Sequence, residues 1–370
     1  RFKESGMLKQ LVVTGCFVQR YGYKLRNEMP EVDGWLGTGE IHRIADVIKG
    51  SDESPAPMLI SRPVFAADHC LPRIQSTPFY TAYLRIAEGC ANKCAYCLIP
   101  KLRGPFRSRT MDALLAEASE MAAHGVKEIN LIAQDTSRYG EDIYGKSRIM
   151  DLLAGLSRIE GIRWVRLLYF HPTRLTEGFL DFMDENEVVV PYLDLPFQHS
   201  HPALLKVMRR DPGNNTPWNL MSMIRNRNRK IHVRTSLMVG FPGETEEMFE
   251  NLCDFVRMAQ FDQLGVFVFS LEKGTMAARL LPLVDNAIAR ERRERLMALQ
   301  ADISKRKNQR MVGRVLPVLI EGQSPETDLL LAGRTATMAP DVDGRVLINE
   351  GDGVVGDILP VQITEAHAYD

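Results

Sequence analysis

Three cysteines, Cys90, Cys94 and Cys97, stand close together with the spacing C-x3-C-x2-C. They directly follow an apolar run and are expected in a loop, where Gly89 and small neighbours let three thiolates reach one metal centre. A structural zinc site requires four protein ligands, usually in paired C-x2-C units, and the sequence has no second pair. Iron–sulfur clusters normally take four cysteines, so three leave one iron open to another ligand. The spacing therefore favours such a cluster over zinc, and Tyr96 is placed to stack on a planar ligand.

The elements that must position this loop alternate between short apolar runs and helical periods. Six apolar runs are predicted to be strands: 83–87, 128–133, 164–170, 188–195, 232–239 and 264–269. Helices are predicted at 110–124, 148–159, 174–184, 216–228 and 244–260. Six βα units imply an α/β domain with a parallel sheet, open or closed into a partial (βα)6 barrel. In such folds the site lies at the carboxyl ends of the strands, where the cysteine loop falls.

Further domains are expected on both sides of this barrel. The N-terminal segment contains a strand at 11–14 and a second βα pattern at 32–49, which is typical of the back half of an α/β domain. Residues 50–78 are rich in Ser, Pro and Ala and are predicted to be a linker. A charged helix at 286–309 precedes a tail that is predicted to be a small all-β barrel of OB-like size. The β-rich runs of the tail are 314–320, 345–348 and 354–363.

The charges are distributed unevenly along the chain. The totals of 46 Lys and Arg and 47 Asp and Glu give a formal net charge of −1, which is no global sign of nucleic-acid binding. Residues 311–370, however, hold three basic and ten acidic residues, a formal charge of −7, which leaves +6 for the rest. A basic body thus carries an acidic tail.

The composition also limits the class of protein. Hydrophobic residues at 45% and charged residues at 25% are typical of a globular protein. No apolar run approaches the roughly 18 residues of a membrane span, no signal peptide is evident, and six cysteines are too few for a disulfide scaffold. We expect a cytoplasmic, multi-domain protein without a membrane partner. Because the sequence opens at Arg1 without a Met, we also expect a fragment.

The cysteine loop, with its aromatic residue before the last cysteine, resembles that of radical S-adenosylmethionine (SAM) enzymes. The resemblance implies that Cys90, Cys94 and Cys97 hold a [4Fe–4S] cluster. In that family the open iron is chelated by the amino and carboxylate groups of SAM, and one electron cleaves the sulfonium to a 5′-deoxyadenosyl radical. The cofactor then supplies the radical, and the protein positions the C–H bond that the radical attacks.

Two other segments resemble the same family. Gln134 and Asp135 follow the second strand, where the family binds the methionine amino group, although either residue could equally form an Asx turn that ends the strand. Gly240 and Gly243 follow the fifth strand and resemble the glycine-bearing segment beside the adenine. The alternative for this segment is a plain strand-to-helix turn with Glu244 in the first helical turn.

The domain order is similar to that of the methylthiotransferases, which combine an N-terminal domain with a second cluster, a radical SAM barrel and a C-terminal TRAM domain. The resemblance implies domains at 1–67, 68–307 and 308–370. It also makes Cys16 one ligand of a second [4Fe–4S] cluster, because Thr14-Gly15-Cys16 resembles the third N-terminal ligand of the family. The two earlier ligands have no counterpart here, so the second cluster is expected to be incomplete in this chain. Without the resemblance Cys16 would be taken for a small buried hydrophobe.

Two substrate classes occur in that family: an adenosine in tRNA, and the β-carbon of an aspartate in the small-subunit ribosomal protein S-twelve (uS12). The segment 192–199, Tyr-Leu-Asp-Leu-Pro-Phe-Gln-His, resembles the enzymes that act on the ribosomal protein. The acidic tail agrees, because it would repel tRNA phosphates and attract a basic protein, although it could serve solubility alone. We therefore predict uS12 or the ribosomal subunit as partner, together with an electron donor, and regard tRNA as the second candidate. A zinc-holding, RNA-associated module without catalysis and a radical enzyme of another kind stay as alternatives.

Overall fold

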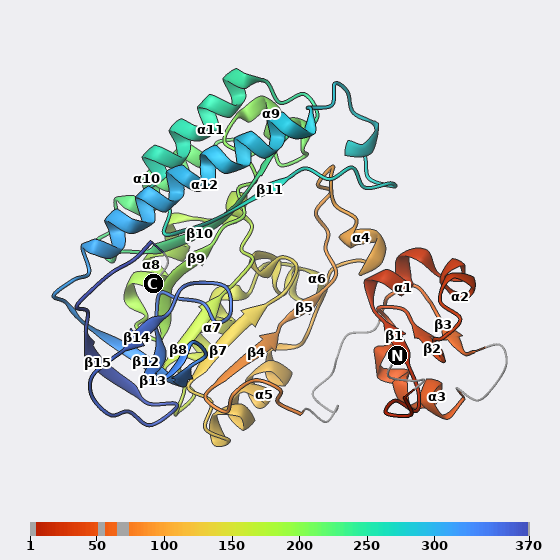
Figure 1. The fold of residues 1–370 in the computed structure, drawn as a ribbon, viewed down its shortest axis with the longest axis horizontal. Coiled ribbons are helices and arrows are strands. Elements are labelled where there is room, and N and C mark those ends of the chain that lie inside the picture. The colour runs from red at the N-terminus through yellow and green to blue at the C-terminus, as the bar shows by residue number, and fades with distance from the viewer. Residues whose placement is uncertain (1–4, 51–55, 65–73, 369–370) are drawn as a thin grey trace.

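The computed structural model of the chain describes residues 5–50, 56–64 and 74–368. A small N-terminal α/β domain, a parallel sheet with its helices, and a C-terminal antiparallel sheet follow one another within these residues (Figure 1). No helix in the described ranges is long and apolar enough to cross a membrane. Cys70, which fits no ligand pattern in the sequence, lies outside the described residues.

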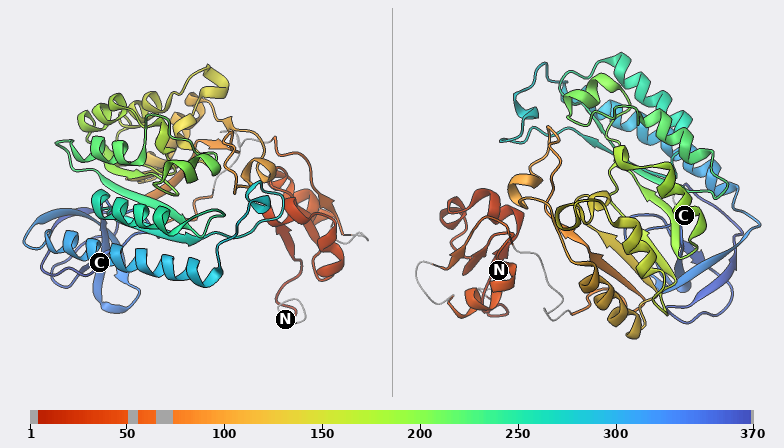
Figure 2. Two further views of the ribbon diagram at one scale, coloured as in Figure 1. Left: turned by 90° about the horizontal axis from the view of Figure 1, so that it is seen from above. Right: turned by 180° about the vertical axis from the view of Figure 1, so that it is seen from behind.

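The central sheet has six parallel strands in the order β11-β10-β9-β8-β7-β4. They are β4 (Thr81–Arg85), β7 (Glu128–Ile132), β8 (Trp164–Leu167), β9 (Val189–Asp194), β10 (His232–Val239) and β11 (Gln263–Val268). Because all these strands are parallel, their carboxyl ends lie at one edge of the sheet. The sheet curves into an open, partial barrel, which confirms the predicted fold class (Figure 2).

Helices cover the outer face of this sheet (Figure 1). They are α5 (Met111–Ala123), α7 (Ile149–Leu156), α8 (Glu177–Glu185), α10 (Pro217–Arg225), α11 (Glu246–Ala259) and α12 (Asn286–Gln309). Alternate strand residues point at them, so that Val233, Leu237 and Val239 of β10 are fully buried while their neighbours are partly exposed. The side chain of Thr245, which precedes α11, caps its first turn. Cys253 on the inner side of α11 is buried in this core.

Short elements surround the carboxyl ends of the strands. They are β5 (Ala87–Glu88), α4 (Ile99–Leu102), β6 (Arg107–Ser108), η2 (Thr136–Arg138), α6 (Glu141–Tyr144), η3 (Pro172–Arg174), α9 (Pro202–Val207) and η4 (Ala277–Arg279). The antiparallel pair β5–β6 closes the base of the cysteine loop, because its strands flank residues 89–106.

The C-terminal tail folds into a curled antiparallel sheet in the order β14-β13-β12-β15. Its strands are β12 (Val315–Ser324), β13 (Thr327–Thr335), β14 (Val346–Ile348) and β15 (Ile358–Gln362). The small all-β module is therefore confirmed, but the sequence analysis missed β13. This strand is rich in Leu, Ala, Gly and Arg rather than β-branched or aromatic residues, so pairing with β12 and β14, and not intrinsic preference, makes it a strand.

The tail packs on the inner face of the parallel sheet, near the amino ends of its strands. Leu319 and Ala339 of the tail join a buried apolar cluster with Trp164, Tyr192 and other residues of the barrel. Three charged groups are buried in the same interface: Glu128 accepts hydrogen bonds from Arg166 at 2.8 Å and from Arg334 at 2.7 Å. The tail thus closes the end of the barrel that lies opposite the cysteine loop.

The N-terminal domain has a parallel sheet in the order β1-β2-β3, with β1 (Val12–Thr14), β2 (Gly34–Leu36) and β3 (Met58–Leu59). Its helices are α1 (Cys16–Tyr21), α2 (Lys24–Glu28), η1 (Ile41–Arg43) and α3 (Ile44–Lys49). Val18, Leu25, Val32 and Trp35 form its small core. Strand β3 falls in the predicted linker 50–78, so that prediction was wrong for this part. Its two residues pair with β2, and the carbonyl of Pro57 just before them accepts a hydrogen bond from Trp35.

Candidate active site

A pocket lies at the carboxyl ends of β4, β7, β8 and β9. It is lined by Cys90, Asn92, Cys94, Tyr96, Cys97, Ile99, Gln134, Asp135, Tyr169, His171, Pro196 and Arg210. The parallel sheet brings these residues together, because loops that are distant in sequence leave adjacent strands at the same edge. Of the predicted site residues, the three cysteines, Tyr96, Gln134 and Asp135 share this pocket, whereas Gly240, Gly243 and Cys16 do not line it.

The backbone of the cysteine loop is tightly held. Gly89 has φ +79°, and a Cβ atom there would lie 2.1 Å from the carbonyl oxygen of Pro105, so glycine is required at this position. Farther along, Ala95 N–H donates to the carbonyl of Met208 at 2.9 Å, and the carbonyl of Ala95 accepts from Ala277 N–H at 2.9 Å. The loop is thus attached to both the α9 region and the segment after β11.

Each of the three sulfurs accepts a hydrogen bond. Cys90 Sγ accepts from Asn92 N–H at 3.4 Å, Cys97 Sγ accepts from Ile99 N–H at 3.4 Å, and Cys94 Sγ accepts from a terminal guanidinium nitrogen at 3.5 Å. That guanidinium belongs to Arg210, which also donates to the carbonyl of Pro196 at 2.7 Å. Donors of this kind stabilise thiolates, which are the form in which cysteine binds metal.

Burial opposes the same ionisation. Burial raises the pKa of the Cys90 thiol to about 11 and also raises the pKa of Cys97. Thiols in such a place become thiolates when a metal binds, so the donor set fits a metal centre. Among the described residues, no group of three or more His, Cys, Asp or Glu side chains gathers tightly enough to hold a single metal ion.

Gln134 and Asp135 have different roles. Asp135 Oδ1 accepts from the backbone N–H of Ser137 at 3.1 Å, and its Oδ2 accepts from Asn92 at 2.7 Å, so this carboxylate forms the Asx turn that was the alternative in the sequence. By contrast, Gln134 Oε1 is buried and has no hydrogen-bond partner among the residues that the structure describes. A buried acceptor without a donor costs free energy, and a ligand amino group in the pocket would supply the donor.

Tyr96 lines the pocket, but its ring also packs against a small core. Its neighbours there include Leu204, Leu205, Met208 and Phe241. Burial raises the pKa of its hydroxyl well above the ordinary value, so the phenol stays neutral. The ring is thus fixed at the wall of the pocket, and stacking on a planar ligand stays a prediction.

Sequence analysis did not identify His171, Arg210 and Tyr169 as pocket residues. Burial, together with Arg210 and two further arginines, lowers the pKa of His171 to about 3, so its imidazole is neutral at physiological pH. His171 directly follows the predicted strand 164–170, and this position was its only signal in the sequence. Tyr169 falls inside that predicted strand and gave no signal, because the structure ends β8 already at Leu167. Arg210 follows a helix, and no local pattern places it beside a cysteine.

The glycine segment after β10 has a structural explanation within the described residues. Gly240 has φ +74°, and a Cβ atom there would lie 2.6 Å from the Cβ of Ala289 on α12. Gly240 N–H donates to Glu244, whose carboxylate also accepts from Arg292 at 3.0 Å and lies 3.4 Å from His199. This network shapes the turn into α11, and the proposed role beside the adenine stays a prediction.

Comparison with known proteins agrees with this geometry. The radical SAM superfamily matches residues 84–256, and the TRAM domain matches residues 312–370. A protein of Pelobacter propionicus named "Ribosomal protein uS12 methylthiotransferase RimO" is 44% identical over 371 residues, which cover 100% of this chain and 82% of that protein. A protein of the same name from Geobacter sulfurreducens is 46% identical over 369 residues, with coverages of 100% and 83%. The chain belongs to the RimO family of radical SAM methylthiotransferases.

A solved structure shows the same fold. The radical SAM methyltransferase TsrM of Kitasatospora setae, with tryptophan and a SAM analogue bound, superposes with a TM-score of 0.54 at 16% identity. The match covers 70% of this chain and 55% of that chain. Radical SAM membership implies a [4Fe–4S] cluster and SAM, and the cysteines and Gln134 described above are consistent with both.

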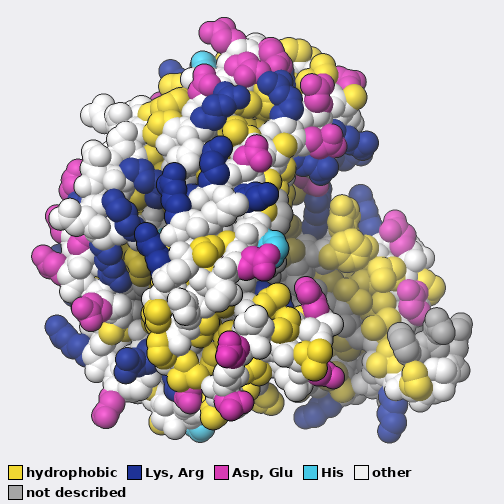
Figure 3. Space-filling model, turned by 60° about the vertical axis from the view of Figure 1, so that its left-hand side comes forward, with side chains coloured by type: hydrophobic (Ala, Val, Ile, Leu, Met, Phe, Trp, Pro, Cys, Tyr) yellow, Lys and Arg dark blue, Asp and Glu magenta, His cyan; other side chains and the backbone are white. Residues whose placement is uncertain are grey.

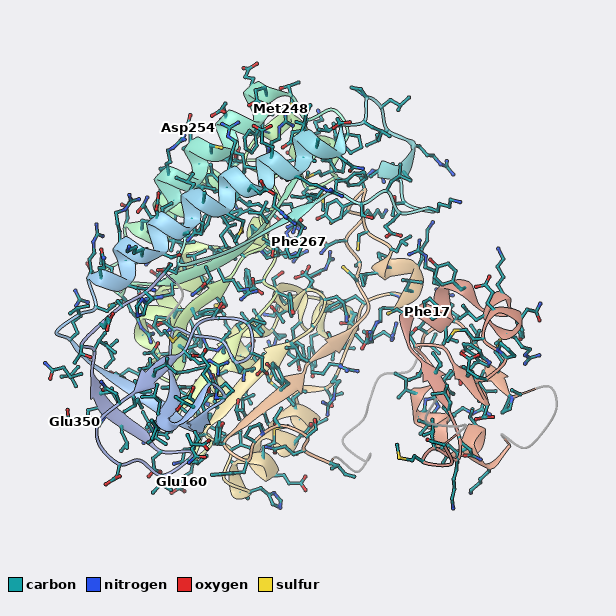
Figure 4. All side chains as sticks on the ribbon, in the orientation of Figure 1. Phe17, Glu160, Met248, Asp254, Phe267 and Glu350 are labelled. Carbon is teal, nitrogen blue, oxygen red and sulfur yellow. The ribbon has the colours of Figure 1, made fainter. Side chains whose placement is uncertain are left out.

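In this methylthiotransferase, Cys16 lies at the start of α1, outside the pocket but in contact with the barrel. Its Sγ accepts a hydrogen bond from Arg103 Nε at 3.2 Å, and Arg103 also pairs with Glu88 at 3.1 Å, two residues before Cys90. Figure 4 shows Phe17, next to Cys16, on the side of the N-terminal domain that is turned toward α4. A recess separates this domain from the barrel in the space-filling view (Figure 3). The N-terminal domain thus contacts the loop after the three cysteines, although none of its described residues lines the pocket.

Proposed function

We propose that this protein inserts a methylthio group at the β-carbon of an aspartate of ribosomal protein uS12. The proposal rests on one observation of the structure, the pocket in which three hydrogen-bonded thiols face the unpartnered Gln134 oxygen. The full-length similarity to RimO proteins supports the choice of substrate, because their name states that they act on uS12.

In this proposal Cys90, Cys94 and Cys97 hold a [4Fe–4S] cluster that has one open iron. When bound, the cluster supplies the electron that cleaves SAM into a radical able to remove hydrogen from an unactivated carbon. Gln134 Oε1 accepts a hydrogen bond from the amino group of SAM and so orients it. The N–H groups of Asn92 and Ile99 and the guanidinium of Arg210 reduce the negative charge on the sulfurs.

The second cluster is also part of the proposal. Cys16 supplies one of its ligands, and Arg103 holds that sulfur against the loop that carries Glu88 and Cys90. This contact would keep the sulfur source next to the radical site, because a methylthio group must be added to the same carbon that loses hydrogen. The two earlier ligands of the family have no counterpart in this sequence.

The choice of uS12 over tRNA is supported by charge. Acidic side chains of the tail are exposed, among them Glu326, Asp328, Glu350 and Asp352, and they would repel phosphates and attract a basic ribosomal protein. The proposal includes activity in the cytoplasm, which a ribosomal-protein substrate supports, and a reductant that supplies the electron. tRNA adenosine is the competing substrate in the test.

The test uses the protein extended to the length of its RimO relatives and reconstituted anaerobically with iron and sulfide. Purified uS12 and bulk tRNA compete in one reaction with SAM and a reductant, and mass spectrometry detects the product. We expect a methylthio mass gain on an aspartate of uS12, whereas a gain on tRNA adenosine would refute the proposed substrate.

A matched pair of cysteine variants tests the cluster ligands. Cys94→Ala should abolish 5′-deoxyadenosine formation and lower the iron content, because Cys94 lies in the pocket. Cys253→Ala serves as the control, since this cysteine is buried in the helical core away from the pocket. If Cys94→Ala forms 5′-deoxyadenosine at the wild-type rate, the assignment is wrong.

A further inference from the structure

Tyr169 combines two features that are not explained by folding. Its side chain lines the pocket of the three cysteines, and yet it is 51% exposed to solvent. Its hydroxyl has no hydrogen-bond partner within the described ranges, so the ring is not held there by a contact of its own. Exposed aromatic rings next to a reactive pocket are suited to contact a ligand that arrives from solvent.

The backbone of Tyr169 is turned so that the ring reaches the pocket. In β8, Val165 and Leu167 point into the helical core, while Leu168 points to the inner face of the sheet. Strict alternation would place residue 169 under the helices, but Phe170 occupies that position instead. The reason is the left-handed conformation of Tyr169, with φ +56°, which shifts the alternation by one residue. A ring that would otherwise be buried is thereby placed at the mouth of the site.

Neighbouring strands hold this conformation in place. Asp194, at the end of β9, accepts a hydrogen bond from Tyr169 N–H with its Oδ2 at 3.0 Å, and its backbone carbonyl accepts from Phe170 N–H at 3.0 Å. Thr136, after β7, donates from its backbone N–H and its hydroxyl to the carbonyl of Tyr169 at 3.1 and 3.2 Å. A left-handed conformation is unfavourable for an aromatic residue, and the hydrogen bonds from Asp194 and Thr136 compensate for it.

We propose that Tyr169 is a substrate-positioning residue, whose ring packs against the segment of uS12 that carries the target aspartate. The inference rests on the proposed function and adds to it the protein group that meets the peptide. SAM is bound in the depth of the pocket by the cysteine loop and Gln134, whereas the half-exposed ring faces what enters afterwards. A rigid aromatic surface offers a large contact area at a low cost in side-chain entropy, which suits the alignment of a flexible peptide.

The test compares Tyr169→Ala, Tyr169→Gly and Tyr169→Phe in the reconstituted, extended protein. Tyr169→Gly removes the ring and also relieves the left-handed backbone, so it keeps the experiment informative if the alanine variant is unstable. Binding of uS12 is measured by fluorescence anisotropy, SAM binding by calorimetry, and the methylthio product and 5′-deoxyadenosine by mass spectrometry. Tyr23→Ala, which removes an exposed aromatic ring of the N-terminal domain, is the matched control.

We expect the alanine and glycine variants to bind uS12 about tenfold more weakly and to form more 5′-deoxyadenosine per methylthio product, with SAM binding unchanged. Tyr169→Phe should match the wild type both in uS12 binding and in the amount of 5′-deoxyadenosine per methylthio product, because it retains the ring. The inference is wrong if both ring-less variants bind uS12 within a factor of about two of the wild type, or if they lose SAM binding instead. If the wild-type protein neither binds nor modifies uS12, the proposed function itself fails, and this result is visible before any variant is made.

Discussion

Removal of the charge on Glu128 is expected to loosen the tail from the barrel. This carboxylate is wholly buried and lies between Arg166 on β8 and Arg334 on the tail, at 2.8 and 2.7 Å. Burial alone would raise its pKa, but the two guanidinium groups outweigh burial and lower it from 4.5 to about 2. Glu128→Gln would keep the shape of the side chain but take the anion from buried Arg166 and leave buried Arg334 paired with Glu321 alone, at 2.7 Å.

The size of the effect follows from the burial of this ion pair. The loss of one partner from a buried ion pair typically costs about 3–5 kcal/mol, and the lowered pKa of Glu128 agrees in direction, because the folded state favours its ionised form. The unfolded carboxyl group takes up a proton near its ordinary pKa of 4.5, while the folded one stays ionised down to about 2. The contribution of Glu128 to stability is therefore complete above pH 4.5 and is lost as the pH falls toward 2.

The assay is urea unfolding of wild type and Glu128→Gln over a range of pH, combined with limited proteolysis of the segment that joins α12 to β12. We expect a loss of about 3 kcal/mol at pH 7 that shrinks as the pH falls, together with faster cleavage of that segment. Asp254→Asn is the control, because its exposed pair with Arg257 should contribute less than about 1 kcal/mol. A Glu128→Gln protein within about 0.5 kcal/mol of the wild type at pH 7 would refute the reasoning.

Three further substitutions test the loops around the site. Gly89→Ala would place a Cβ atom 2.1 Å from a backbone carbonyl, so we expect less iron per chain after reconstitution; a wild-type iron content would contradict this. Gly240→Ala should lower the free energy of unfolding by about 2 kcal/mol, and more than Gly243→Ala, because only the first substitution meets a neighbouring atom, at 2.6 Å. Arg103→Met removes the hydrogen bond to Cys16 and should spare 5′-deoxyadenosine formation while it lowers the methylthio yield; equal losses of both would count against the role of this contact.

Much of the barrel could be predicted from the sequence, because its strands are short apolar runs that alternate with amphipathic helices. The six runs correspond to β4, β7, β8, β9, β10 and β11. The missed strands β3, β6 and β13 depend on their neighbours instead: β3 and β6 have only two residues each, and β13 has strong β-forming residues only at its ends. Short or weakly β-forming strands exist because a partner strand is already in place, and one segment alone gives no indication of such pairing.

The residues of the candidate site likewise fall into two groups: some are identified by a local sequence pattern, and others are brought to the site only by long-range contacts. The loop of Cys90, Cys94 and Cys97 is recognised from spacing, because one short segment carries the whole ligand set. Arg210 reaches Cys94 only because α9 lies beside the loop in the folded chain, and no sequence spacing records that contact. Tyr169 is the more demanding case, since the predicted strand 164–170 includes it and alternation predicts that its ring is buried, whereas β8 ends at Leu167. The ring turns toward the pocket because the backbone of Tyr169 is left-handed. Asp194 at the end of β9 and Thr136 after β7 hold this backbone, so the position of the ring can be inferred only from the folded structure.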